Sequence, residues 1–174
     1  GWDITTGIRQ EFWSATDGMV SGTQVKDRHL SPTTPKFSIG YQPNKWKFRY
    51  SWARTHRFPV ISELYQTLSS PTSITQSNAL LKAENGMHHN LMIEYAIPKG
   101  YLRVNIFRDD IKNAINRVQT VSGLLTTRAT QNIGTTSTTG VEFIYNQKRI
   151  ARTPIDFMLN FTWMDAKIEN GPTV

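Results

Sequence analysis

Apolar and polar residues alternate with a period of two in several short stretches of this chain. The clearest stretch runs from residue 46 to residue 53, where aromatic residues occupy one face of an extended strand and charged or small residues the other: Trp46, Phe48, Tyr50 and Trp52 against Lys47, Arg49, Ser51 and Ala53. A soluble strand more often buries aliphatic residues. An aromatic face opposite a charged face is typical of a strand with lipid outside and water inside.

The same alternation predicts about seven strands, at residues 2–12, 36–42, 46–53, 91–97, 102–107, 141–145 and 155–164. Long polar segments at 14–34, 58–84 and 111–130 alternate with short turns at 42–45, 98–100 and 147–152. Residues 111–115 could form a helical turn, but a strand that extends past the membrane is favoured. The pattern predicts an all-β, antiparallel, up-and-down transmembrane β-barrel with long extracellular loops and short periplasmic turns.

Two other architectures are alternatives. A small, complete outer-membrane barrel could act as an adhesin or a structural protein. A soluble β-sandwich could act as a binding module, although its loops would not alternate so strictly in length. The chain has neither a signal peptide nor an initiating Met, and it ends in the loop-like residues 169–174, so we expect a fragment of a longer barrel.

Composition agrees with a barrel. Hydrophobic residues make up 38% of the chain, and the apolar runs are far shorter than the roughly 18 residues of a spanning helix. Aromatic residues reach 11%, as expected for girdles at the two membrane interfaces. The chain has no Cys, which excludes thiolate metal sites and thiol catalysis.

The net charge of +7 favours anionic partners, such as the phosphates of lipopolysaccharide, ferric chelates or nucleic acid. The Lys and Arg residues are spread along strands and turns and form no basic helix, so we expect no nucleic-acid partner. His88 and His89 are neighbours on a predicted strand and point to opposite faces, which argues against a metal site. Asp109 and Asp110 do the same, and no nucleophile lies near a base in the sequence, so we expect no enzyme.

The segment from Arg54 to Tyr65 reads RTHRFPVISELY and resembles the R-G-F-R-A-P-T-L-S-E-L-Y signature of TonB-dependent outer-membrane receptors. The identical positions are Arg54, Arg57, Pro59, Ser62, Glu63, Leu64 and Tyr65, while His56 replaces Phe and Phe58 replaces Ala. Residues 78–84 resemble that family's N-P-N-L-K-P-E segment, with Ala at both Pro positions. Segments 107–115 and 132–142 follow in the order of the family, so the resemblance covers most of the chain.

The resemblance implies that residues 1–174 are part of the barrel domain of such a receptor, without its plug domain and other strands. The whole receptor would bind and import a scarce nutrient across the bacterial outer membrane, most often a ferric siderophore, driven by the TonB complex through the plug. Outer-membrane lipids and lipopolysaccharide would surround it. No cofactor is expected, and the cargo would be an iron chelate. Haem receptors of the family usually carry a His between the two motifs, and residues 58–78 contain none.

These considerations predict three sets of site residues. The signature residues should form a loop just beyond the outer membrane interface, with Arg57 directed at Glu63: Arg54, Arg57, Pro59, Glu63, Leu64 and Tyr65. Candidates for facing the ligand or the lumen are His56, Arg57, Arg49 and Arg103. Residues predicted to face lipid are Trp46, Phe48, Tyr50, Trp52, Phe157 and Phe161, together with Ile155 and Leu159.

Overall fold

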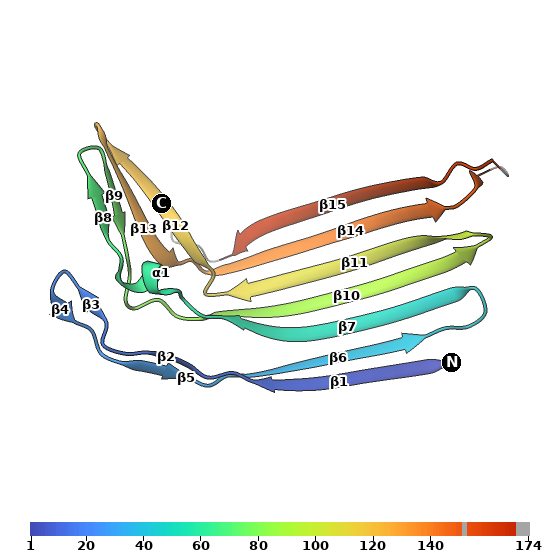
Figure 1. Ribbon diagram of the computed structural model, residues 1–174, viewed down its shortest axis with the longest axis horizontal. Helices are drawn as coiled ribbons and strands as arrows, with labels where there is room; N and C mark the ends of the chain where they lie inside the picture. The colour runs from blue at the N-terminus through green and yellow to red at the C-terminus, as the bar shows by residue number, and fades with distance from the viewer. Residues whose placement is uncertain (151–152, 170–174) are drawn as a thin grey trace.

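The computed structural model describes residues 1–150 and 153–169. Parts of the turn expected at 147–152 and of the loop-like stretch at 169–174 therefore lie outside the described residues. Seven long strands form one antiparallel sheet, in the order β1 (Trp2–Gln10), β6 (Thr33–Tyr41), β7 (Trp46–Arg57), β10 (Glu84–Ile97), β11 (Gly100–Lys112), β14 (Thr135–Gln147) and β15 (Phe157–Glu169) (Figure 1). The sheet follows the chain as an up-and-down meander, which confirms the predicted architecture.

Several strands differ in length from those predicted. β10 begins at Glu84 and β14 at Thr135, because backbone pairing continues where the apolar alternation has stopped. β15 begins only at Phe157, so Ile155 precedes the strand and its assignment to a strand was wrong. Ile155 instead belongs to the turn before β15, where its carbonyl accepts a hydrogen bond from the Ile150 amide (2.9 Å).

The register aligns the apolar residues of neighbouring strands into three rows on one side of the sheet. Side chains alternate between the faces of a sheet, so directly paired residues share a face. From the short turns upward, these apolar rows are Trp46, Tyr95, Leu102, Tyr145 and Leu159; Phe48, Ile93, Val104, Phe143 and Phe161; and Tyr50, Leu91, Ile106, Val141 and Trp163. We call this side the apolar face.

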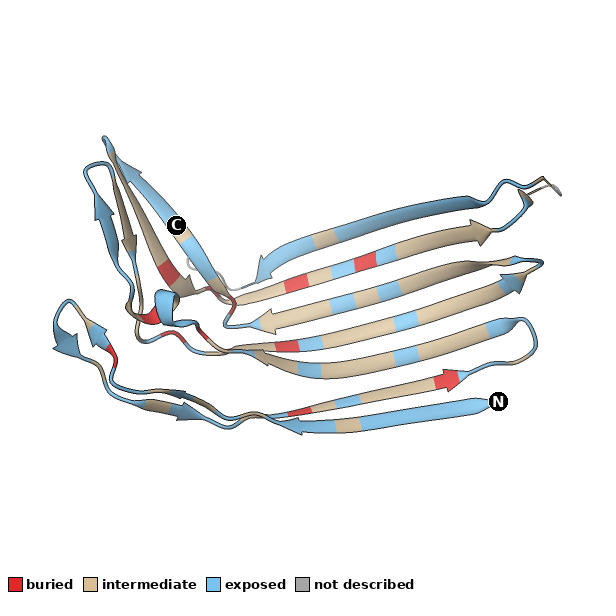
Figure 2. Ribbon diagram, in the orientation of Figure 1, coloured by how far each residue is buried: buried red, intermediate tan, exposed pale blue. Residues whose placement is uncertain are grey.

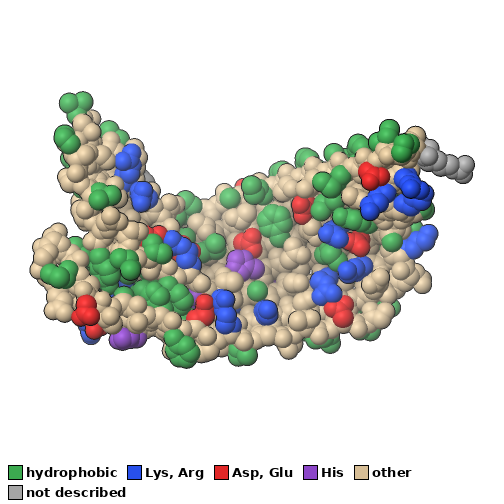
Figure 3. All heavy atoms as spheres, viewed as in Figure 1, with side chains coloured by type: hydrophobic (Ala, Val, Ile, Leu, Met, Phe, Trp, Pro, Cys, Tyr) green, Lys and Arg blue, Asp and Glu red, His purple; other side chains and the backbone are tan. Residues whose placement is uncertain are grey.

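The opposite side, the polar face, carries charged and amide side chains in matching rows. Lys47, Glu94 and Arg103 are paired across three strands, as are Arg49, Met92 and Asn105. Figure 3 shows a hollowed face of the molecule with acidic, basic and His side chains in its middle and hydrophobic ones along its edges. No described helix has the length and apolar character to cross a membrane.

The three long segments lie together at one end of the sheet, and the short turns lie at the other (Figure 1). The first segment contains β2 (Trp13–Ala15), β3 (Met19–Val20), β4 (Thr23–Gln24) and β5 (Arg28–Leu30). The second contains α1 (Ile61–Tyr65), β8 (Leu68–Ser70) and β9 (Ser73–Gln76), and the third β12 (Ile115–Ser122) and β13 (Leu125–Asn132). β12, β13, β9 and β8 form a second sheet in which β13 and β9 are parallel.

This second sheet corrects two predictions. Residues 58–84 are not an irregular loop, because α1, β8 and β9 lie within them. The third segment is not a simple extension of the preceding strand: β11 ends at Lys112, Asn113 adopts a positive φ of 55°, and β12 starts at Ile115 in a different sheet. Gly123, with φ 58°, occupies the first central position of the two-residue turn between β12 and β13, where glycine is favoured.

The hydrophobic residues that the described chain buries most deeply lie at the base of the long segments. They are Leu64 (1% exposed), Leu81 (0%), Ala114 (8%) and Ile133 (5%). Figure 2 shows buried positions around α1 and at the base of the second sheet, whereas the seven-stranded sheet is mostly intermediate or exposed. The apolar face of that sheet therefore does not serve as a packed core within this chain.

Candidate functional site

The signature segment starts where β7 leaves the sheet. β7 ends at Arg57, and the buried Pro59, which has no amide hydrogen to donate, lies just after it. α1 then follows, with the Val60 amide donating to Glu63 Oε2 (3.0 Å) and the Glu63 amide donating to the Val60 carbonyl (3.0 Å). The predicted loop beyond the end of the strand thus contains one short helical turn that Glu63 closes.

Arg57 joins this turn to the next strand. Its Nη2 lies 2.6 Å from Glu63 Oε1, and its Nη1 lies 3.5 Å from Glu84 Oε1. Glu84 is the residue directly opposite Arg57 in the pairing of β7 with β10, and it also accepts a hydrogen bond from the Ile115 amide (2.7 Å). Both carboxylates are more buried than Arg57, whose side chain is 45% exposed. The expected contact between Arg57 and Glu63 is present, and Glu84 extends it to the third long segment.

A set of reciprocal hydrogen bonds fixes the second and third segments to each other. The Lys82 amide donates to Asn132 Oδ1 (2.8 Å), while Asn132 Nδ2 donates to the Lys82 carbonyl (3.0 Å) and the Asn113 carbonyl (2.7 Å). The Ile133 amide donates to the Ala114 carbonyl (2.8 Å). We call the buried residues Leu64, Leu81, Ala114 and Ile133, together with Asn132, the loop hub.

The first long segment is attached to the same hub. Arg28 donates through Nη1 to the Ala79 carbonyl (2.8 Å) and through Nη2 to the Leu81 carbonyl (2.7 Å). The guanidinium of Arg28 also lies over the ring of Trp13, which stacks on Phe58 with centroids 5.7 Å apart. All three long segments therefore meet around the signature, and a ligand arriving at this end would encounter one connected structure.

The polar face below the hub is held by local ion pairs. Arg49 Nη2 lies 2.7 Å from Asp3 Oδ1, and Arg103 Nε donates to Glu94 Oε2 (2.8 Å). Arg49, Arg103 and Arg57 lie on the polar face. That this face lines a lumen or meets a ligand stays a prediction. Because Arg49 and Arg103 each have a carboxylate partner, they are partly neutralised where they lie.

A second cluster on the polar face lies closer to the loop hub. His88 contacts Asp109 Oδ1 through Nδ1 (2.7 Å) and Thr55 Oγ1 through Nε2 (2.8 Å). Gly86 leaves room for it, since a Cβ there would come within 2.5 Å of Thr55 Oγ1 and 2.7 Å of His88 Nε2. Each side chain has its partner within the cluster, so the arrangement orients the imidazole more than it prepares a reaction.

Sequence reasoning missed the pairing of His88 with Asp109, although the sequence contains a signal for it. The turn at Pro98–Lys99 pairs Ile97 with Gly100. Counting nine residues back from Ile97 along β10 and nine forward from Gly100 along β11 gives the pair His88 and Asp109. Counting three residues in each direction gives the pair Glu94 and Arg103. The prediction that His88 and His89 point to opposite faces is confirmed, since His89 contacts Tyr50 Oη on the apolar face (2.8 Å).

His56 does not join the arginines of the polar face. His56 lies on the same face of β7 as Trp52, four residues further along the strand and beyond the apolar rows. Burial and the positive charge of Arg54 lower the pKa of His56, against an opposing effect of Glu11, and its Nδ1 is buried without a partner among the described residues. The lowered pKa disfavours the charged imidazolium, which weakens the assignment of His56 as a contact for an anionic ligand.

Among the described residues, no group of three or more His, Asp or Glu side chains is placed to hold a metal ion. The lipid-facing set predicted from the sequence, within β7 and β15, lies on the apolar face: Trp46, Phe48, Tyr50, Trp52, Phe157 and Phe161. Trp46, Tyr50, Phe157 and Phe161 are among the exposed hydrophobic residues. Their side of the sheet is thus established, and contact with lipid remains a prediction.

The model of the family described as TonB dependent receptor-like, beta-barrel, matches residues 1–174. No curated protein sequence matches the chain. The solved siderophore receptor PirA from Pseudomonas aeruginosa is similar, with a TM-score of 0.70, 17% identity, and coverage of 97% of this chain and 29% of PirA. The ferric enterobactin receptor PfeA from the same organism has a TM-score of 0.68, 19% identity, and coverage of 94% and 24%.

A double mutant of the hemophore receptor HasR from Serratia marcescens, solved with its hemophore HasA and heme, is also similar. Its TM-score is 0.66 with 16% identity, and the match covers 97% of this chain and 31% of HasR. The chain therefore spans about a quarter to a third of the length of these three structures. At these sequence identities, the similarity to the three structures establishes a shared fold alone.

Proposed function

Because the chain belongs to the β-barrel family of TonB-dependent receptors, we propose that residues 1–174 form part of the barrel of an importer for a ferric siderophore. The family consists of transport receptors of the Gram-negative outer membrane, not of enzymes. A soluble β-sandwich is disfavoured, because in a sandwich a second sheet covers the inner face, and here large exposed side chains such as Phe161 and Trp163 remain on the apolar face. A small, complete barrel has no observation of its own in support.

The observation that carries the transport proposal is the combination of an apolar wall with connected loops at one end. Along β15 the apolar face extends from Phe157 to Trp163, which is about 20 Å at 3.3 Å per residue. This approaches the apolar band of about 25 Å on an outer-membrane barrel. The apolar face would then contact membrane lipids and lipopolysaccharide, the polar face would line the lumen, and the loop hub would lie at the extracellular mouth.

The polar face supports a plug domain as the partner in the lumen. Ion pairs such as Arg103 with Glu94 form between strands of the sheet itself. These side chains therefore present hydrogen-bonding groups with little net charge to the lumen. Such a surface suits a folded domain that fills a wide barrel. The TonB complex would act on that plug and transmit energy to the transport step.

The cargo is proposed to be an anionic iron chelate. The net charge of +7 favours an anion, and Arg57 presents a partly exposed guanidinium at the mouth. Haem is the second candidate, because HasR was solved with heme. The absence of His from residues 58–78, where haem receptors of the family usually have one, supports the siderophore instead.

Growth of an iron-starved strain that expresses only the full receptor containing this chain tests the cargo. We expect growth on a ferric siderophore and none on haem as the sole iron source. A strain carrying an empty vector controls for leakage. Growth on haem together with failure on a panel of catecholate, hydroxamate and carboxylate siderophores would reject the proposed cargo class.

A further inference from the structure

A pocket of about 540 Å³ lies at the short-turn end of the seven-stranded sheet, between the turn that precedes β11 and the turn that follows β14. Its volume is in the range of about 300–1,000 Å³ that small-molecule sites occupy. The proposed transport function assigns the pocket no role. The residues that line it are Lys99, Gly100, Tyr101, Asn146, Lys148 and Arg149.

The backbone holds the two turns against each other. The Lys148 amide donates to the Lys99 carbonyl (2.9 Å), and a Cβ at Gly100 would collide with the Asn146 carbonyl oxygen, so glycine permits the close approach. Lys99 and Arg149 both adopt a positive φ, of 63° and 53°, which glycine or asparagine would adopt at lower cost. The turns therefore place cationic side chains at positions where the backbone alone does not favour them.

The pocket belongs to the polar face. Tyr101 and Asn146 are directly paired between β11 and β14, and they share this face with Arg103, two residues further along β11. The guanidinium of Arg103 lies 4.7 Å from the centre of the Tyr101 ring and fixes one side of it. In the proposed membrane orientation, the pocket therefore lies on the lumen wall at its periplasmic end.

The pocket carries a net positive charge. Within residues 1–150 and 153–169, no carboxylate lies within ion-pair distance of Lys99, Lys148 or Arg149. Asp156 accepts a hydrogen bond from the Arg149 amide (3.0 Å) and offsets one of the three charges. Figure 3 shows basic side chains gathered at this end of the hollowed face.

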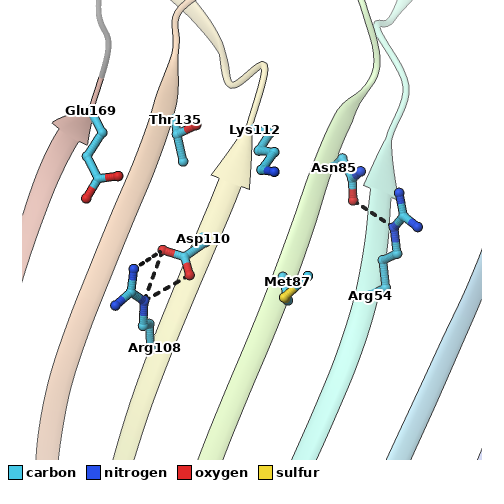
Figure 4. Close-up of a pocket in the computed structure, with 8 residues that line it drawn as sticks. All are labelled: Arg54, Asn85, Met87, Arg108, Asp110, Lys112, Thr135 and Glu169. Carbon is cyan, nitrogen blue, oxygen red and sulfur yellow. Dashed lines mark hydrogen bonds and ion pairs between the residues drawn. The ribbon is translucent and has the colours of Figure 1, made fainter.

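Arginines elsewhere on the sheet have carboxylate partners. On the polar face, Arg103 Nε donates to Glu94 Oε2 (2.8 Å). On the apolar face near the long loops, Arg108 Nε lies 2.9 Å from Asp110 Oδ2 (Figure 4). The cations of the pocket have no such partner, so they attract an anion that these closed pairs would not.

We propose that this pocket is an exit site, which binds the anionic iron chelate weakly as the chelate leaves the lumen for the periplasm. The inference rests on the proposed function, for both the membrane orientation and the cargo. Cations that line a cleft raise the local concentration of anions, and Lys and Arg donate charge-assisted hydrogen bonds to oxygen atoms of a chelate. Lys99, Lys148 and Arg149 are exposed to water, which keeps the binding weak enough for release.

A carboxylate of the plug domain is the competing occupant. The chelate is favoured for two reasons. A negative charge is a property of the proposed cargo, and a pocket of about 540 Å³ with the Tyr101 ring on its wall is larger than a single carboxylate fills.

Relaxation of a nitroxide spin label by the bound ferric ion tests the exit site directly. The label is attached at Gln147→Cys in an otherwise Cys-free full receptor, because Gln147 pairs with Gly100 beside the pocket. In detergent both ends of the barrel are open to solution, so the ferric siderophore that supports growth reaches the pocket without transport. Iron bound at the mouth is about 40 Å from the label, because β11 has 13 residues that rise about 3.3 Å each, and relaxes it little.

The labelled wild type should show saturable relaxation enhancement with the ferric siderophore and none with its diamagnetic gallium complex. K99Q/K148Q/R149Q should bind about tenfold more weakly, because each exposed charge pair contributes a factor of about two. K99R/K148R/R149K keeps the three charges and should bind within about threefold of the wild type. K26Q/K112Q/R117Q is the matched control, since it removes three exposed charges at the long-loop end, and it should bind like the wild type.

Uptake of radioactive ferric iron separates the exit site from the mouth. In energised cells, K99Q/K148Q/R149Q should have a maximal uptake rate at least about threefold below that of the wild type, because the cargo leaves the lumen more slowly. In de-energised cells, the same variant should bind the siderophore at the mouth with unchanged affinity. The heat-modifiable gel mobility of each variant verifies barrel folding, and K148Q alone provides the test if the triple variant does not fold.

Four results would overturn the exit site: no relaxation enhancement in the wild type, as expected if a plug carboxylate fills the pocket; equal enhancement in K99Q/K148Q/R149Q; an equal loss in K26Q/K112Q/R117Q; or an unchanged maximal uptake rate. A wild type that takes up no ferric siderophore would reject the proposed cargo and the exit site together. A wild type that takes up the siderophore, with a pocket variant that behaves in the same way, would reject the exit site alone.

Discussion

Truncation of Leu81 should loosen the long loops without loosening the barrel. Leu81 is fully buried in the loop hub, and its carbonyl accepts a hydrogen bond from Arg28 (2.7 Å). Replacement of a buried Leu by Ala costs about 2–5 kcal/mol. We take the lower part of this range, about 2–3 kcal/mol, because a small cluster between loops can relax around the lost methyl groups.

That loss should appear as faster amide exchange in the hub. If exchange follows local opening, about 2–3 kcal/mol corresponds to roughly 30- to 150-fold less protection. The amides to follow are those of Lys82, which donates to Asn132, and Ile133, which donates to Ala114. Hydrogen–deuterium exchange with mass spectrometry on the full receptor resolves the peptides that contain them.

The neighbouring residue supplies the control. Leu80 is 81% exposed, so Leu80→Ala removes the same atoms without opening a cavity, and protection should stay within about twofold of the wild type. Peptides from β10 and β11 should exchange at the same rate in both variants. Equal effects of the two substitutions, or a parallel loss of protection in β10 and β11, would refute the idea of a hub that is independent of the barrel wall.

Two further substitutions probe the mouth and the polar face. Arg57→Ala should leave barrel assembly, measured by heat-modifiable gel mobility, nearly intact, because a half-exposed ion pair is worth at most about 1 kcal/mol. The variant should slow ligand uptake, because Glu63 and the signature turn lose their partner, and failed assembly or wild-type uptake would contradict this. Gly86→Ala should lower the stability of the folded receptor against urea by about 1 kcal/mol, because the new methyl group would separate Thr55 from His88; a variant as stable as the wild type would show that the two side chains do not depend on that space.

The wall of the sheet was predictable because each strand carries its own signal. Alternation along residues 46–52 assigns every side chain to a face without knowledge of the neighbouring strand. Short turns then fix the pairing, so the contact between Glu94 and Arg103 also follows from the position of Pro98–Lys99. The error at Ile155 arose because apolar residues of a turn can continue the alternation without continuing the strand.

The loop hub could not be predicted in the same way. Leu64, Leu81 and Ile133 come from two separate segments, and none lies in a run with a clear period. Asn132 is one of several amides in the third segment, and only the folded chain brings it to the backbone of Lys82. The hairpin of β12 and β13 did carry a signal: residues rich in Val, Ile and Thr flank the turn that Gly123 begins.

The charged side chains that lie beyond the apolar rows on the same side of the sheet show a further limit of pattern reasoning. Alternation places Arg54 on the same side as Trp52, yet the sequence does not show that Lys112 lies two strands away on the same side. Apolar rows therefore follow from single strands, whereas charged clusters between strands require the register.

The orientation of the seven-stranded sheet in the membrane is the central claim, and nitroxide spin labels test it most directly. This chain has no Cys, so single Cys substitutions within it can be labelled specifically in the full receptor when the remainder is Cys-free. The measurement is power saturation with oxygen, which enriches in lipid, against a water-soluble nickel chelate. Labels at Tyr50 and Phe161 should be accessible to oxygen, and labels at the adjacent Arg49 and Asn160 to the nickel chelate. Accessibility that does not alternate between these neighbouring positions would contradict a membrane barrel with the apolar face in lipid.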